Sequence, residues 1–122
     1  MIRVDFAETL EERLETIQEF MLAQDVESAA ARTEQLWGEI YRFGDLVALH
    51  PKIGRPAGLL AAGSIEGQLR LDRVLRLASE ANLPELREYV LRTHLILYAH
   101  SDTHVLLLSI RHERELGYIP EA

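Results

Sequence analysis

The sequence predicts an α+β fold, and three observations support that prediction. Apolar and polar residues alternate near the start of the chain, which indicates a short strand from residue 2 to residue 6. Two helical stripes of apolar residues follow, and three short apolar, β-prone segments come after them. Because the helices precede the last three strands, we expect one sheet with the helices packed on one of its faces.

Two long helices are predicted in the first half of the chain. One stripe runs from Leu10 to Met21 and the other from Leu36 to Val47, with apolar residues three or four positions apart. Asp25 can cap the second helix, because its carboxylate accepts hydrogen bonds from first-turn amides. Pro51 ends that helix, and the short connection predicts antiparallel packing. Two aromatic residues flank the second stripe and are expected in the core, namely Trp37 and Tyr41.

A third helix is predicted between residues 64 and 81, after a loop at Gly54-Arg55-Pro56. Ser64 can cap it, while Gly67 weakens it by about 1 kcal/mol relative to Ala. Its expected apolar face consists of Leu71, Val74, Leu75 and Ala78.

Three strands are predicted in the last third, at residues 86–90, 95–99 and 105–110. Ser101-Asp102 suits a tight turn between the last two, so we expect a three-stranded antiparallel meander. With the N-terminal strand, this meander would complete one sheet. A chain of 122 residues has the usual length of one domain, so we expect a single domain over residues 1–122.

Composition excludes several classes of protein. The chain has no cysteine, which rules out disulfides and thiolate metal sites. Its net charge is −7, and residues 1–48 hold 4 basic and 11 acidic residues, so a broad basic surface for nucleic acid is not expected. No apolar run is long enough for a membrane span, and no secretory signal is expected at the N-terminus. We therefore expect a cytoplasmic protein without membrane partners.

Histidines invite a metal hypothesis that their spacing does not support. His94, His100 and His104 fall within eleven residues. On one strand His94 and His100 would share a face but lie about 20 Å apart, at about 3.3 Å per residue. His100 and His104 could approach across the hairpin, yet no third ligand is evident. The Gly54-Arg55-Pro56 loop also lacks the spaced glycines of a phosphate loop. We predict neither a metal site nor a cofactor.

Several short segments resemble, in their order and spacing, the RelE/ParE toxin superfamily. The segments are Leu86–Glu88, His94–Tyr98, Val105–Ile110, Arg111–Tyr118 and, earlier in the chain, His50–Pro56. The resemblance covers nearly the whole chain and implies a RelE/ParE-like α+β domain. Residues 57–83 are longer than the usual connection, so they are interpreted as a helical insertion.

The resemblance implies the toxin of a type II toxin–antitoxin pair, a class that includes plasmid stabilisation toxins. RelE-like members cut messenger RNA in the ribosome, whereas ParE-like members bind and inhibit DNA gyrase. Both are neutralised by a cognate antitoxin, which we expect at the open sheet edge and the groove between sheet and helices. Because an unpaired sheet edge promotes association, the free chain is also expected to form a homodimer.

In RelE-like enzymes, basic residues on the sheet and a C-terminal Tyr supply proton transfer and charge stabilisation. Glu113 and Glu115 lie within the Arg111–Tyr118 segment of this chain and would repel a phosphate bound there. The matching catalytic positions implied by the resemblance are Arg87, Arg111 or His112, and Tyr118.

Binding to a protein is the alternative that the acidic balance favours. Lys52, Arg55, Tyr98 and Arg114 are the expected contact residues. We therefore expect a ParE-like toxin that binds rather than an enzyme. A ribosome-dependent endoribonuclease stays open as an alternative, as does a non-toxic family member that serves as a binding module.

Overall fold

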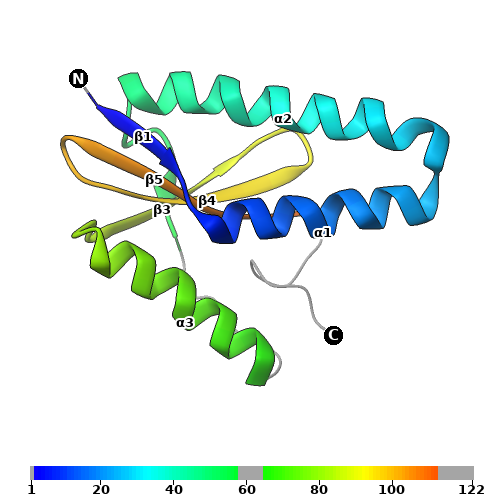
Figure 1. The fold of residues 1–122 in the computed structure, drawn as a ribbon. Coiled ribbons are helices and arrows are strands. Elements are labelled where there is room, and N and C mark those ends of the chain that lie inside the picture. The colour runs from blue at the N-terminus through cyan, green and yellow to red at the C-terminus, as the bar shows by residue number, and fades with distance from the viewer. Residues whose placement is uncertain (1, 58–64, 113–122) are drawn as a thin grey trace.

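The computed structural model describes residues 2–57 and 65–112, and these form three helices and a five-stranded sheet (Figure 1). The α+β class predicted from the sequence is confirmed. The elements, in chain order, are β1 (Arg3–Phe6), α1 (Glu8–Gln24), α2 (Val26–Leu49), β2 (Arg55–Pro56), α3 (Ile65–Glu80), β3 (Glu85–Val90), β4 (His94–His100) and β5 (His104–His112).

Helices α1 and α2 form an antiparallel hairpin joined through Asp25, as predicted (Figure 1). The Asp25 carboxylate accepts a hydrogen bond from the Glu27 amide at 3.1 Å, which satisfies a first-turn donor of α2. The Asp25 amide donates to the carbonyl of Met21 and closes α1. One residue thus ends the first helix and begins the second.

The sheet is wider than the predicted meander, and it is mixed. Its strand order is β1-β5-β4-β3-β2. Strands β3, β4 and β5 pair antiparallel, whereas β1 lies parallel to β5, with Arg3 opposite His104. The segment predicted as a loop contributes β2, whose Pro56 pairs with Arg87 at the sheet edge. Proline is tolerated there because the outer side of an edge strand has no neighbouring strand, so the missing backbone N–H of proline costs no ladder hydrogen bond on that side.

The helices cover both faces of the sheet, so the expectation that they share one face is wrong. Helices α1 and α2 lie on one face and α3 lies on the other (Figure 1). Strand β4 is buried throughout, because its side chains point alternately to the two faces of the sheet and helices cover both faces. On α3, Leu71, Val74 and Ala78 are buried as predicted, but Leu75 is 40% exposed.

Strand β5 carries one extra residue at a bulge. Leu97 pairs with Ser109, yet the next residue, Tyr98, pairs with Leu107, so Leu108 has no counterpart on β4. Leu107 and Ile110 consequently both join the core under α1 and α2, although they are three positions apart. Beyond the bulge, His112 lies opposite His94 on the same face.

The fully buried Tyr98 ties the segment after α2 to the sheet. Its hydroxyl donates to the Pro51 carbonyl at 2.8 Å and accepts from the Gly54 amide at 2.9 Å. Burial raises the pKa of the Tyr98 phenol, so it stays a neutral donor. A Cβ on Gly54 would lie 2.6 Å from the Glu88 carbonyl oxygen, so only glycine allows this close approach.

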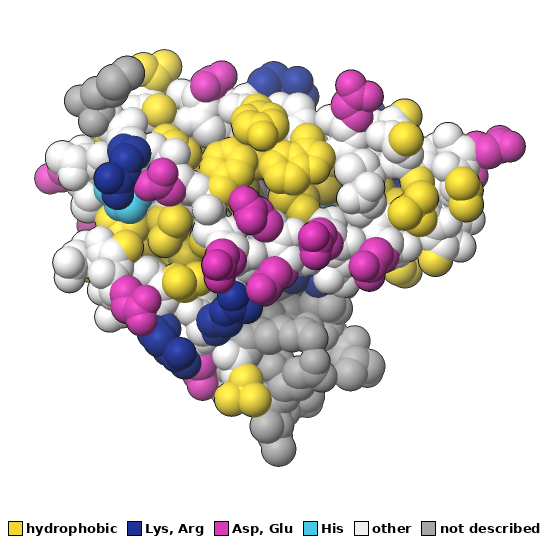
Figure 2. All heavy atoms as spheres, in the orientation of Figure 1, with side chains coloured by type: hydrophobic (Ala, Val, Ile, Leu, Met, Phe, Trp, Pro, Cys, Tyr) yellow, Lys and Arg dark blue, Asp and Glu magenta, His cyan; other side chains and the backbone are white. Residues whose placement is uncertain are grey.

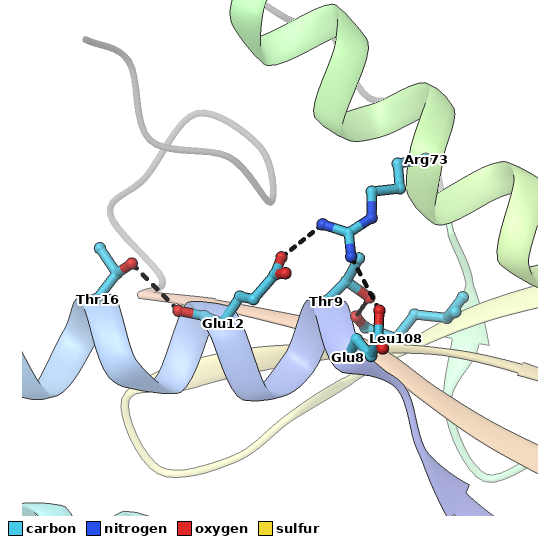
Figure 3. A network of polar contacts seen from close by, with 6 residues as sticks. All are labelled: Glu8, Thr9, Glu12, Thr16, Arg73 and Leu108. Carbon is cyan, nitrogen blue, oxygen red and sulfur yellow. Dashed lines mark hydrogen bonds and ion pairs between the residues drawn. The ribbon is translucent and has the colours of Figure 1, made fainter.

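Polar contacts join α1 to α3 and to β5 (Figure 3). The Arg73 guanidinium reaches from α3 to Glu12 at 2.6 Å and to Glu8 at 3.1 Å. The Thr9 hydroxyl donates to the Leu108 carbonyl at the bulge. These contacts hold the first turns of α1 against β5 and against α3, the helix on the opposite face of the sheet.

Candidate functional site

The residues implied for RNA cleavage lie in separate places. Arg87 is held by structural contacts, because its Nε lies 3.1 Å from His100 Nε2 and its Nη1 donates to the Gly54 carbonyl at 2.7 Å. Arg111 and His112 are adjacent on β5, so their side chains leave opposite faces of the sheet.

The distance along the sheet also separates Arg87 from His112. Arg87 pairs with Tyr98, whereas His112 pairs with His94, four residues away on β4. At about 3.3 Å per residue, this offset amounts to about 13 Å along the strands. The structure therefore does not bring these two side chains to one phosphate. Tyr118 lies outside the described residues.

The residues expected to contact a partner are also dispersed. Lys52 is exposed in the turn after α2. Arg55 is exposed on β2 and pairs with Glu88 at 2.7 Å. Tyr98 belongs to the core and presents no surface, and Arg114 lies outside the described residues. Of the expected contact residues that the structure describes, Lys52 and Arg55, near the β2 edge, are on the surface.

A group of aromatic rings reaches the surface where β1 meets α2 of the helical hairpin. Trp37 stacks on Tyr41 with ring centroids 5.7 Å apart, and Phe6 approaches Tyr41 at 5.6 Å. Tyr41 is 59% exposed, so the expectation that it belongs to the core is wrong. Trp37 and Phe6 are half-buried and pack against the core with one side, so the expectation for Trp37 holds in part. We call Phe6, Trp37 and Tyr41 the aromatic patch.

Carboxylates border the aromatic patch. Figure 2 shows hydrophobic side chains gathered between α1 and α2, with a row of Asp and Glu along α1 below them. That helix contributes an exposed acidic series, namely Glu8, Glu11, Glu12, Glu15 and Glu19. The patch is thus an apolar surface with an acidic rim.

Two of the histidines considered for metal binding pair with side chains of other strands. His104 Nε2 lies 2.8 Å from the Asp5 carboxylate. His100 Nε2 lies 3.2 Å from the Glu85 carboxylate and faces Arg87. Over residues 2–57 and 65–112, no cluster of three or more metal-ligating side chains is present.

A pocket of about 820 Å³ opens between the hairpin and the sheet. We call it the hairpin pocket; the middle and C-terminal part of α1, the middle of α2 and the turn from β3 to β4 enclose it. Its charged and ionisable lining is Arg13, Arg32, Arg92, His94, His112 and Glu39. Its apolar lining is Ile17, Phe20, Met21 and Leu36.

His94 reports the electrostatic character of the hairpin pocket. Its side chain is 5% exposed, and its Nδ1 lies 2.9 Å from the Thr93 hydroxyl. Burial lowers the pKa of His94 to about 4, and the nearby His112, Arg13 and Arg32 add to that shift. His94 is therefore neutral at pH 7 inside a positively charged environment.

The sequence led us to expect a groove between sheet and helices, but it did not identify the residues that line the hairpin pocket, although one signal pointed to them. Arg13 is three residues from Leu10 and four from Ile17, so it lies on the apolar stripe of α1. A cation on the buried face of a helix needs polar partners, so it indicates a polar site beneath α1. The other pocket residues come from distant parts of the chain.

No protein-family model and no curated protein matches this chain. None of the helices in the described residues is both long and apolar enough to cross a membrane.

Proposed function

We propose that this chain is a toxin of the ParE-like kind, which acts by binding a protein and is neutralised by a cognate antitoxin. DNA gyrase is the target that the resemblance implies. The observation that carries the proposal is the aromatic patch on the helical hairpin, because it is an exposed surface suited to a protein partner.

The composition of the patch supports binding to a protein. Tyr and Trp are enriched in protein interfaces and dominate their binding energy, since rigid rings bury a large area at low entropic cost. Trp37 is the only tryptophan of the chain, and it lies beside the exposed Tyr41. Isolated exposed apolar residues are ordinary, but three contacting rings form a continuous surface.

The charge around the patch indicates the character of the target surface. Glu8 and Glu12 pair with Arg73, and the other carboxylates of the α1 row would attract a basic protein surface and speed the encounter. The same carboxylates would repel RNA and DNA. Together with the separation of Arg87 from His112, this charge favours binding over the ribonuclease alternative.

The element order gives the proposal a second support. A strand, a helical pair and a final meander follow one another, as the resemblance implies. Helix α3 occupies the additional segment between the pair and the meander. These features are compatible with a RelE/ParE-like domain that carries an insertion.

The experiment measures the binding of gyrase and the inhibition of supercoiling by the purified chain. We expect inhibition, and we expect Tyr41→Ala to weaken binding at least roughly tenfold, which is the loss typical of an interface hot spot. Leu49→Ala is the matched control, because Leu49 is 75% exposed on the same helix and does not belong to the patch.

Four outcomes would contradict the proposal in different ways. If the chain neither binds gyrase nor inhibits it, gyrase is not the target. If Tyr41→Ala and Leu49→Ala bind equally well, the aromatic patch is not the contact surface. If the chain cuts messenger RNA on ribosomes, the ribonuclease alternative replaces the proposal, and unaffected growth during expression without an antitoxin would favour the non-toxic binding module.

A further inference from the structure

The hairpin pocket differs in charge from the rest of this acidic chain. Among the described residues that line it, Arg13, Arg32 and Arg92 stand beside one carboxylate, that of Glu39, although the whole chain carries a net charge of −7. We propose that the hairpin pocket binds a small amphipathic anion, with one carboxylate or phosphate head group and an apolar body. This site is separate from the aromatic patch and does not depend on the proposed toxin function.

Two of the arginines are available to an anionic head group. Arg32 on α2 and Arg92 in the turn from β3 to β4 are exposed, and neither forms an ion pair with a carboxylate of the described residues. Guanidinium groups bind carboxylate and phosphate oxygens through paired hydrogen bonds, which are stronger than bonds between neutral groups. These side chains come from different elements and line the same pocket.

The third arginine lies deeper, on α1. Arg13 is 8% exposed, and its Nε donates to the Ile110 carbonyl at 3.1 Å. That hydrogen bond holds the guanidinium against β5, at the wall of the pocket. A buried cation strengthens the attraction for an anion, because the effective dielectric constant is lower there than in water.

The apolar part of the lining explains why the ligand should be amphipathic. Ile17, Met21 and Leu36 are buried in the wall, and Phe20 is 62% exposed at the same pocket. A plain inorganic anion would leave the exposed Phe20 ring in contact with water, whereas an apolar body would cover it. The volume of about 820 Å³ falls within the usual range for small-molecule sites, about 300–1,000 Å³.

The surrounding helices argue against a long polyanion. The exposed faces of α1 and α2 carry many carboxylates, Glu19 and Glu34 among them. A nucleic acid that crossed the pocket would meet those carboxylates, whereas a small ligand would contact only the lining. The charge distribution therefore selects a small anion over a polymer.

His94 supplies a spectroscopic signal for occupancy. An anion beside the pair of His94 and His112 stabilises the imidazolium form, and so it raises the pKa of His94 from about 4. A bound neutral molecule would not raise that pKa, because it adds no negative charge and further excludes water.

The test is isothermal titration calorimetry of the full chain with four probes. Decanoate and decyl phosphate carry an anionic head on an apolar body, decanol carries only the body, and acetate carries only the head. We expect decanoate or decyl phosphate to bind at least roughly tenfold more tightly than decanol and acetate, since each missing part removes one set of contacts. The tighter of the two anionic probes identifies the preferred head group.

Variants locate the binding. Arg92→Ala and Arg32→Ala should each weaken binding of the better probe about tenfold, because each removes a charge-assisted contact. Arg76→Ala is the matched control, since Arg76 is an exposed arginine on α3 outside the pocket. Its replacement changes the net charge equally and should leave the affinity within about twofold.

Nuclear magnetic resonance gives an independent readout. With decyl phosphate bound, whose head group keeps a negative charge at pH 4, the His94 ring resonance should titrate about one pH unit higher than in the free protein. The proposal is overturned if neither anionic probe binds, if decanol binds equally well, if both arginine variants bind like the control, or if the His94 titration does not move.

Discussion

Protonation of the buried His94 should make the fold acid-sensitive between pH 6.5 and pH 4. The pKa of His94 is lowered from 6.5 to about 4 by burial and by neighbouring cations. In that window the unfolded chain binds a proton at this position and the folded chain does not. The free energy of unfolding therefore falls as the pH falls from 6.5 to 4.

The size of this effect follows from the shift. Lowering the pKa from 6.5 to about 4 corresponds to about 3 kcal/mol, at about 1.4 kcal/mol per pH unit. The free energy of unfolding should therefore fall by about 2 kcal/mol between pH 7 and pH 4.5. His94→Asn removes the titration and retains a polar group near the Thr93 hydroxyl, the partner of His94 Nδ1. Between pH 7 and pH 4.5 the free energy of unfolding should fall less in the variant than in the wild type, and the difference between the two falls should be about 2 kcal/mol.

Urea unfolding of both proteins at pH 7 and pH 4.5 measures this difference. The comparison uses the change with pH within each protein, so a general loss of stability in the variant does not affect it. Parallel losses in the two proteins would refute the reasoning. A His94 ring resonance that titrates near pH 6.5 would refute the structural cause.

Three further predictions concern the packing around Tyr98 and α3. Tyr98→Phe leaves the Pro51 carbonyl and the Gly54 amide without their hydroxyl partner and should lower the free energy of unfolding by about 1–3 kcal/mol in urea titrations. Gly54→Ala places a methyl group 2.6 Å from the Glu88 carbonyl oxygen and should cost roughly 1–3 kcal/mol, which a lowered melting temperature would report. Arg73→Ala removes the exposed ion pairs to α1 and should speed amide exchange in α3 while the other helices keep their protection.

The helical hairpin could be predicted from the sequence because its signals are local. Apolar spacing over Leu10–Met21 and Leu36–Val47 gives the buried face of each helix, and Asp25 marks the junction. The bounds of the last three strands were also predicted to within two residues. Patterns of this kind depend on neighbours along the chain, so one sequence suffices to find them.

The arrangement of the layers depends on contacts that no local pattern encodes. The stripe on α3 shows which side of the helix is buried, but it does not show which sheet face receives it. The aromatic patch was missed for a related reason: Trp37 and Tyr41 lie at the border of the α2 stripe, where burial depends on how α1 and β1 approach.

The bulge had the largest effect on the candidate site. Strict alternation along β5 would have continued through Leu108 and placed His112 on the opposite face. The extra residue exchanges the sheet faces to which the side chains after it point. His112 therefore joins His94 at the hairpin pocket, and Arg111 points to the opposite face. A strand pattern alone does not reveal where such a residue is inserted.

The parallel pairing of β1 with β5 has a consequence for synthesis of the protein. Arg3 pairs with His104, so β1 finds its partner only after about a hundred further residues have left the ribosome. Until then the apolar stripes of α1 and α2 have no sheet to cover them. At roughly 5–20 residues per second, this exposure lasts on the order of several seconds. The nascent hairpin therefore presents its future core to chaperones and other chains before it acquires its native neighbours.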